Sequence, residues 1–249
     1  KMENRAVTFP QTKTILEGIN VPGVQLDDIQ AILNMRDAWR FLMGSIDEPV
    51  TLEYLCKLNE FIARNEALEW GKLRTGSVTI SGTDYTPPVP QEAAVRADLA
   101  AILTAGTSAT EKALNAFCWG TRGQLFWDGN KRTSLTLATK ILLQAGVGVL
   151  TIRDQNMEQF NEALLNYYNT AAAEPLKAFL YENAIQGLGF IHKKIRERPA
   201  VGFLTAFLLW QVSALLISRC ITAHIFQIEI FQRLNTAQLE NVSQASISA

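Results

Sequence analysis

Histidine is nearly absent from this sequence, which holds only His192 and His224, both close to its end. A histidine-based metal site or a serine–histidine–aspartate triad therefore has no histidine to use in the preceding part of the chain. Cysteine is scarce as well: the three cysteines are odd in number and form no CxxC pair. This pattern favours reduced thiols in the cytoplasm over a disulfide framework.

Neither sign of charge dominates, because 23 lysines and arginines face 24 aspartates and glutamates, for a formal net charge of -1. A chain without a basic surplus lacks the electrostatic signature of a nucleic-acid binder, so we expect no nucleic-acid partner. The N-terminal residues contain no apolar stretch behind a basic start. We therefore expect no secretory signal and a cytoplasmic location.

Apolar residues make up 48% of the sequence, enough for one substantial core. Between Gly76 and Pro90, Val78 and Ile80 alternate with polar residues before Gly82, which predicts a short β-hairpin. Elsewhere the apolar spacing is helical. The sequence therefore predicts a mainly α fold, a helical bundle with one short hairpin, whose helices cover residues 26–43, 52–65, 90–104, 107–119, 131–145, 154–170 and 173–186.

The composition changes after residue 188, and the segment 200–218 contains no charged residue. Nineteen residues at about 1.5 Å per residue just span a hydrocarbon core of roughly 30 Å. Lysines and arginines before the segment would keep its N-terminal side in the cytoplasm. Thr205, Gln211 and Ser213 dilute its apolar character, which favours a buried or self-associating helix instead. Residues 189–249 are thus predicted as an apolar extension that serves as a membrane anchor or supports a homodimer.

A polar loop from Asp128 to Thr133 leads into an apolar helix. The first turn of a helix presents unpaired N–H groups and the positive end of the helix dipole, which together bind anions such as phosphate. Gly129 lets the backbone approach a ligand closely, and Lys131 and Arg132 add positive charge. Asp128 would repel a phosphate unless a divalent cation lies between them, and magnesium prefers such oxygen ligands. The loop therefore predicts a magnesium nucleotide; the alternative is an ordinary Asp-Gly turn.

The same residues resemble the motif of the Fic/Doc family, His-x-Phe-x-Asp/Glu-Gly-Asn-Gly/Lys-Arg. Gln124 stands at the position of the motif histidine. The remaining motif positions are occupied by Phe126, Asp128, Gly129, Asn130, Lys131 and Arg132. The resemblance implies a Fic-type helical bundle with three parts: an N-terminal helical region over 1–48, a Fic core over 49–188, and the extension 189–249.

The resemblance also implies an activity, the transfer of AMP from Mg-ATP to a Ser, Thr or Tyr hydroxyl of a protein substrate. Asp128 would then hold Mg²⁺, Asn130 would lie on the α-phosphate side and Arg132 would bind the outer phosphates. Gly129 and Lys131 would complete the ATP site. Lys131 is similar to the Doc branch, whose activity is phosphorylation, so phosphate transfer remains an alternative.

Two further segments carry the resemblance. Residues 74–88 are similar to the family's hairpin flap, in which Val78, Thr79, Ile80 and Gly82 would hold the backbone of the target. Residues 14–18 are similar to its inhibitory helix, which makes Glu17 the inhibitory glutamate. The family's second arginine falls at Leu135, so Arg132 is the partner left for Glu17.

Gln124 is the departure with the largest chemical consequence. A glutamine amide can orient a hydroxyl group but cannot accept its proton near neutral pH. Loss of a general base costs about 10²- to 10⁴-fold in rate, so the transfer is expected to be impaired. The alternatives are a non-catalytic regulator that binds nucleotide or peptide, and a membrane-anchored adaptor whose core docks a partner.

Overall fold

The computed structural model describes residues 7–187, which fall into two compact units. Residues 7–25 belong to one unit, and their only helix is α1 (Phe9–Leu16). The side chain of Gln11 accepts a hydrogen bond from the main-chain N–H of Thr8 at 2.8 Å, which caps the start of α1. Gly18 follows Glu17 with a φ of +83°, a left-handed conformation that suits the end of a helix.

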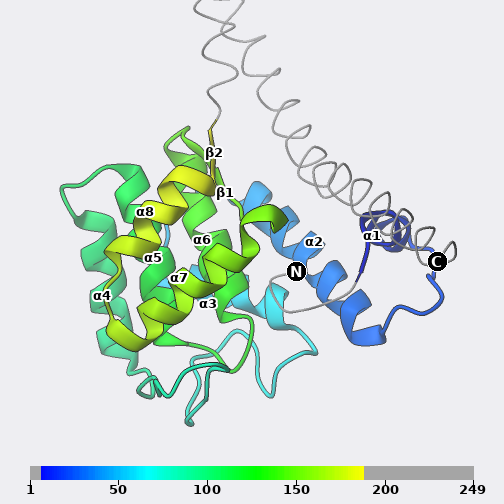
Figure 1. The fold of residues 1–249 in the computed structure, drawn as a ribbon, viewed down its shortest axis with the longest axis horizontal. Coiled ribbons are helices and arrows are strands. Elements are labelled where there is room, and N and C mark those ends of the chain that lie inside the picture. Colours follow the sequence, from blue (N-terminus) through cyan, green and yellow to red (C-terminus); the bar gives the residue numbers. More distant parts are fainter. Residues whose placement is uncertain (1–6, 188–249) are drawn as a thin grey trace, which may run out of the picture. The chain divides into compact units, whose positions relative to one another are not determined.

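Residues 26–187 form the other unit, a helical bundle with one small sheet (Figure 1). The mainly helical fold predicted from the sequence is confirmed, with most boundaries within a few residues of those expected. The helices are α2 (Leu26–Gly44), α3 (Leu52–Ala63), α4 (Glu92–Thr104), α5 (Ala109–Gly123), α6 (Asn130–Gln144), the 3-10 turn η1 (Asp154–Asn156), α7 (Met157–Thr170) and α8 (Glu174–Asn183).

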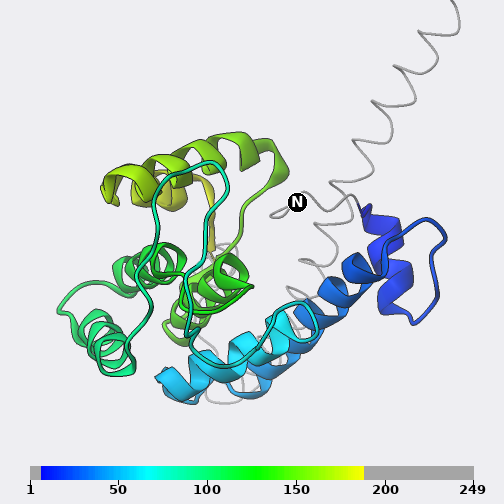
Figure 2. The ribbon, with the colours of Figure 1, turned by 90° about the horizontal axis from the view of Figure 1, so that it is seen from below.

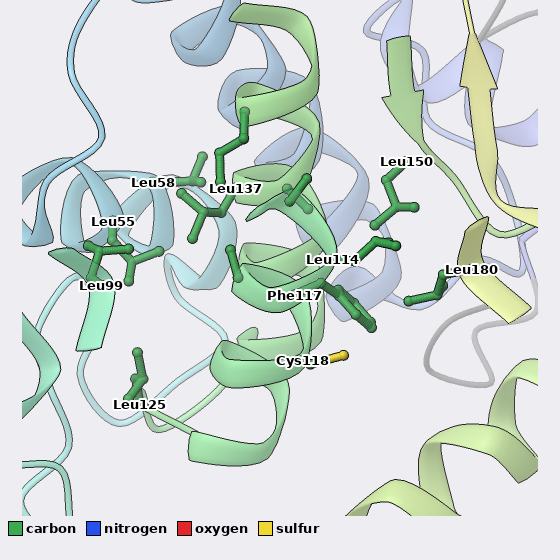
Figure 3. Close-up of a cluster of buried hydrophobic side chains, with 14 of the residues drawn as sticks. Leu55, Leu58, Leu99, Leu114, Phe117, Cys118, Leu125, Leu137, Leu150 and Leu180 are labelled. Atoms are coloured by element: carbon green, nitrogen blue, oxygen red, sulfur yellow. The ribbon is translucent and has the colours of Figure 1, made fainter. Parts of the chain in front are cut away.

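Helix α6 is the centre of this bundle, because most of its side chains are buried on every side. Figure 3 shows apolar side chains of α3, α5 and the strand β1 (Gly148–Leu150) gathered around it, with Leu58 beside Leu137. The polar residues of α6 have partners: Thr136 donates to the carbonyl of Arg132 at 2.9 Å, and the buried Lys140 donates to the carbonyl of Ser45 at 2.6 Å. Paired in this way, polar side chains can occupy a helix interior at low cost.

The predicted hairpin over residues 76–90 is wrong in its secondary structure, because these residues form a loop without paired strands. The sheet of the described residues pairs β1 (Gly148–Leu150) antiparallel with β2 (Ile185–Gly187) instead. Pro87, Pro88 and Pro90 have no N–H to donate to a strand ladder, which explains why the alternating pattern forms no hairpin. Figure 2 shows the loop crossing from α3 toward α7 before it returns to α4.

No helix within residues 7–187 is long and apolar enough to cross a membrane. The predicted anchor, residues 200–218, lies outside the described residues together with the rest of the extension 189–249.

Gly120 marks the closest approach of α5 to α6, and its replacement tests this packing. A Cβ atom at position 120 would lie 2.4 Å from Ser134 Oγ and 3.3 Å from Ser134 Cβ. Gly120→Ala should therefore lower the free energy of unfolding by about 1–3 kcal/mol in urea titrations. Gly106→Ala is the matched control, since no other atom would lie within 4 Å of a Cβ added at this position. Equal stability of the two variants would contradict the close packing of α5 on α6.

Candidate functional site

The loop between α5 and α6 turns sharply at Gln124, whose φ of +44° and ψ of +59° lie in the left-handed region. Such a conformation costs a non-glycine residue roughly 1–2 kcal/mol, so other contacts must stabilise it. The loop then passes Phe126, which is almost wholly buried, and enters α6 through Gly129 with a φ of +74°. A Cβ at Gly129 would lie 3.1 Å from Ile62 Cγ2, so α3 also restricts this position to glycine.

The side chain of Asn130 closes the loop from within. Its Oδ1 accepts a hydrogen bond from the N–H of Phe126 at 2.8 Å, and its Nδ2 donates to the carbonyl of Phe126 at 2.7 Å. Nδ2 also donates to Gln124 Oε1 at 3.1 Å, while Gln124 Nε2 donates to the carbonyl of Thr121 at 2.6 Å. Both ends of the Gln124 amide are therefore held by the protein.

Asp128 is the most accessible of the predicted acidic and amide ligands, with 43% of its side chain exposed. Its Oδ1 accepts a hydrogen bond from the N–H of Gly129, and its Oδ2 lies 3.9 Å from Arg132 Nη2. The buried Asn59 of α3 fixes the backbone here: its Nδ2 donates to the carbonyl of Asp128 at 3.0 Å and to Thr133 Oγ1 at 3.2 Å. The carboxylate is thus presented from a rigid backbone.

Arg132 lies against a carboxylate that the sequence analysis did not anticipate. Its Nη1 is 3.0 Å and 3.2 Å from the two oxygens of Glu66, and both side chains are more than nine-tenths buried. The same nitrogen donates to the carbonyl of Ile62 at 3.3 Å. Asn34 of α2 donates to Glu66 Oε1 at 2.8 Å. The guanidinium is therefore anchored through Nη1, and Nη2 is the end that faces Asp128.

The predicted flap residues occupy the loop of residues 76–90. Val78 and Ile80 are half-buried and Thr79 is exposed, so the alternation of the sequence persists without strand pairing. The tip of the loop rests on α7: a Cβ at Gly82 would lie 3.1 Å from Leu165 Cδ2, and the hydroxyl of Thr83 hydrogen-bonds to Asn169 Oδ1. Tyr85 is covered by Arg122, whose guanidinium lies 3.8 Å from the ring centroid.

Arg74 joins this loop to the turn at Gln124. Its guanidinium donates to the carbonyls of Gln124 and Gly76 and, from the far side of the loop, to those of Pro87 and Pro88. Sequence reasoning gave Arg74 no role of its own. Asn59, by contrast, had a detectable signal, because it is a polar residue on the apolar face formed by Leu55, Leu58 and Ile62.

Glu17 belongs to the unit of residues 7–25, where it lies 4.0 Å from Lys13 across one turn. Its predicted inhibition of the loop at 124–132 stays a prediction.

Part of the chain is similar to a known protein family. Residues 49–142 match the model described as the Fic/DOC family. A similar curated protein is the protein adenylyltransferase Fic of Nematostella vectensis, 24% identical over 220 residues. The match covers 79% of this chain and 50% of that protein, so the chain spans about half the length of this relative.

Two solved structures share the fold. A fragment of Fic-1 from C. elegans aligns with a TM-score of 0.63 and 20% identity, over 73% of this chain and 56% of that chain. A Fic domain containing signaling protein from Bacteroides thetaiotaomicron aligns with a TM-score of 0.60 and 18% identity, over 73% and 76% of the two chains.

The buried pair of Glu66 and Arg132 yields a stability prediction. Glu66→Ala removes the carboxylate from a buried guanidinium, which should cost about 3–5 kcal/mol in the free energy of unfolding. Glu69→Ala is the control on the same loop, because Glu69 is exposed and lies 3.6 Å from Lys72. It should cost less than about 1 kcal/mol. Chemical denaturation of the two variants tests this, and a Glu66→Ala chain as stable as Glu69→Ala would refute the role of the pair.

The buried Tyr167 of α7 leads to a prediction about the pH dependence of stability. Burial raises the pKa of its hydroxyl to about 12, and this hydroxyl donates to the carbonyl of Cys118 at 3.2 Å. The pKa of tyrosine in an unfolded chain is about 10, so the folded chain retains this proton to a higher pH. The contribution of Tyr167 to the free energy of unfolding is therefore complete below about pH 10 and is lost as the pH rises toward 12.

Tyr167→Phe should therefore flatten the fall in unfolding free energy between about pH 10 and about pH 12, measured by urea titration. Burial also raises the pKa values of Tyr168 and Cys118, so part of the slope will remain. The exposed Tyr181 provides the control variant, Tyr181→Phe. An unchanged slope in Tyr167→Phe would argue against a buried hydroxyl at this position.

Proposed function

Because residues 49–142 match the model of the Fic/DOC family, we propose that the chain transfers AMP from ATP to a hydroxyl group of a protein substrate. The curated relative, named a protein adenylyltransferase, supports both the donor and the protein acceptor. The observation that carries the proposal is the loop of residues 124–133, which Asn130 and Asn59 fix at the N-terminus of the buried helix α6.

The nucleotide phosphates would bind at the first turn of α6. The N–H groups of this turn have no acceptor inside the helix, and the helix dipole adds positive potential there. Lys131, on this turn, supplies a cation, and the Nη2 end of Arg132 faces Asp128 from the protein side. Asn130 acts in this proposal chiefly by shaping the loop, because its side chain already bonds Phe126 and Gln124.

Magnesium fits the residues present. Within residues 7–187 no group of three or more His, Cys, Asp or Glu side chains could hold a metal ion alone. Mg²⁺ usually takes only one or two protein carboxylates and completes its shell with phosphate oxygens and water. The accessible carboxylate of Asp128 meets this requirement. When bound, the ion would neutralise negative charge on the phosphates.

In the proposed reaction the substrate hydroxyl oxygen forms a bond to the α-phosphorus, and the bond from this phosphorus to the bridging oxygen breaks to release pyrophosphate. The hydroxyl proton must leave at the same time. Gln124 can accept a hydrogen bond through Oε1 but cannot take up this proton, which therefore passes to water. The proposed enzyme is slow for this reason, although the positioning of its substrates is preserved.

A second candidate function is a non-catalytic regulator that binds a nucleotide or a peptide. The observation that favours it is that Asn130 and Thr121 each hold one end of the Gln124 amide. Such a side chain stabilises the loop without any part in a reaction. Phosphate transfer, suggested by Lys131, is a variant of the first candidate. The two are distinguished by whether the label is transferred from the α- or the γ-phosphate of ATP.

Labelled ATP distinguishes these functions. The unmodified chain, incubated with Mg²⁺, lysate proteins and α-labelled ATP, should transfer label slowly, and Gln124→His should accelerate transfer about 10²- to 10⁴-fold. Label transferred from the γ-position instead would identify phosphorylation. Binding of Mg-ATP in calorimetry without transfer by either chain would favour the regulator. A folded chain that binds no nucleoside triphosphate would refute the transferase and would leave only a regulator that binds a peptide.

Two variants test the assignment of the phosphate site. Lys131→Ala should weaken the binding of ATP, and Asp128→Asn should abolish the part of the affinity that depends on Mg²⁺. Lys57→Ala is the control for removal of one lysine charge, since Lys57 is exposed on α3 and pairs with Glu60 at 2.9 Å. Arg132→Ala is less informative, because it also leaves Glu66 buried without its cation.

A further inference from the structure

The loop of residues 76–90 has no strand ladder, so another interaction must hold its two arms together. The arms leave from Gly76 and return at Pro87 and Pro88, and the side chain of Arg74 binds the carbonyls of all three. Arg74 Nη2 donates to the carbonyl of Pro87 at 3.1 Å and also to that of Pro88. One guanidinium therefore replaces the cross-strand hydrogen bonds that the prolines exclude.

The same side chain reaches the loop between α5 and α6. Arg74 Nε donates to the carbonyl of Gln124, and the main-chain N–H of Arg74 donates to the carbonyl of Leu125 at 3.0 Å. Gln124 is the residue in the strained left-handed conformation. Arg74 thus fixes the backbone at the position where a target hydroxyl would be received, and it fixes the flap relative to that backbone.

The contacts of Arg74 require a guanidinium group. Arg74 is only 1% exposed, and within residues 7–187 its charge is met by carbonyl oxygens, with no carboxylate within ion-pair distance. Burial lowers the pKa of this guanidinium from its usual value. A lysine would carry the charge on one nitrogen and could not span carbonyls on both arms and the loop at once.

We propose that Arg74 is a positioning residue that sets the flap of residues 76–90 at a fixed distance from Gln124, and thereby places the backbone of a bound target against the nucleotide phosphates. The role in transfer rests on the proposed function. The mechanical link between flap and loop does not, so the two can fail separately.

Hydrogen–deuterium exchange of the full chain tests the link. In Arg74→Lys the amides of residues 77–86 should exchange about tenfold faster or more, because several charge-assisted hydrogen bonds are lost, whereas those of α5 and α6 should keep their protection. Arg122→Lys is the matched control: it alters a second arginine against the flap, through Tyr85, and leaves the Arg74 carbonyl contacts intact. It should affect exchange only near Tyr85.

Flap protection in Arg74→Lys equal to that of the unmodified chain would overturn the proposal. If Arg74→Lys fails to fold, hydrogen exchange of the unmodified chain, measured by NMR at increasing urea concentration, tests the link instead. The Nε–H of Arg74 and the flap amides should then exchange through one common opening. A flap that opens while this Nε–H stays protected would equally overturn it.

The rate of label transfer is a measurement that a purely structural role of Arg74 would not change. In the Gln124→His background, Arg74→Lys should lower the rate of α-label transfer at saturating ATP and leave the KM for ATP unchanged, because the phosphate site at α6 is intact. A raised KM with an unchanged maximal rate would contradict positioning of the target. If the unmodified chain binds no nucleotide, the proposed function fails, and the exchange experiment still judges the link.

Discussion

The loop between α5 and α6 keeps its shape because its backbone carbonyls accept hydrogen bonds. The donors lie outside the loop or in the residues where it enters α6. A turn with a left-handed non-glycine residue is costly, and an unpaired buried carbonyl would add to that cost. Two donors come from Arg74, one from Asn130, one from Asn59 of α3 and one from the first turn of α6. The acceptors, in chain order, are the carbonyls of Gln124, Leu125, Phe126, Asp128 and Gly129.

The helical bundle buries several cationic side chains, although its overall charge is balanced. Arg74, Arg132 and Lys140 are each at least nine-tenths buried, and each is satisfied differently: by carbonyls, by a carboxylate and by the end of a helix. A buried charge must be paired or hydrogen-bonded to persist. The protein's own acceptors therefore hold each of these buried cations in a fixed position.

The sequence was sufficient for the resemblance to the family that matches residues 49–142, the mainly helical fold and most helix boundaries, because these depend on local periodicity and on a contiguous motif. It failed at residues 76–90, where local alternation favoured strands but the prolines removed the necessary donors. It also ended the helix before α6 too early, since α5 continues to Gly123. The roles of Glu66 and Arg74 depend on contacts with residues far along the chain, which no local pattern reveals; the roles assigned to Glu17 and to residues 200–218 remain predictions.

The left-handed backbone at Gln124 also bears on how easily the chemistry could change during evolution. Histidine tolerates this conformation better than most side chains, so a histidine at this position would meet no added backbone penalty. The codons for glutamine and histidine differ by one base. A histidine at position 124 is therefore one base substitution away, and Arg74, Thr121 and Asn130 hold the surrounding geometry.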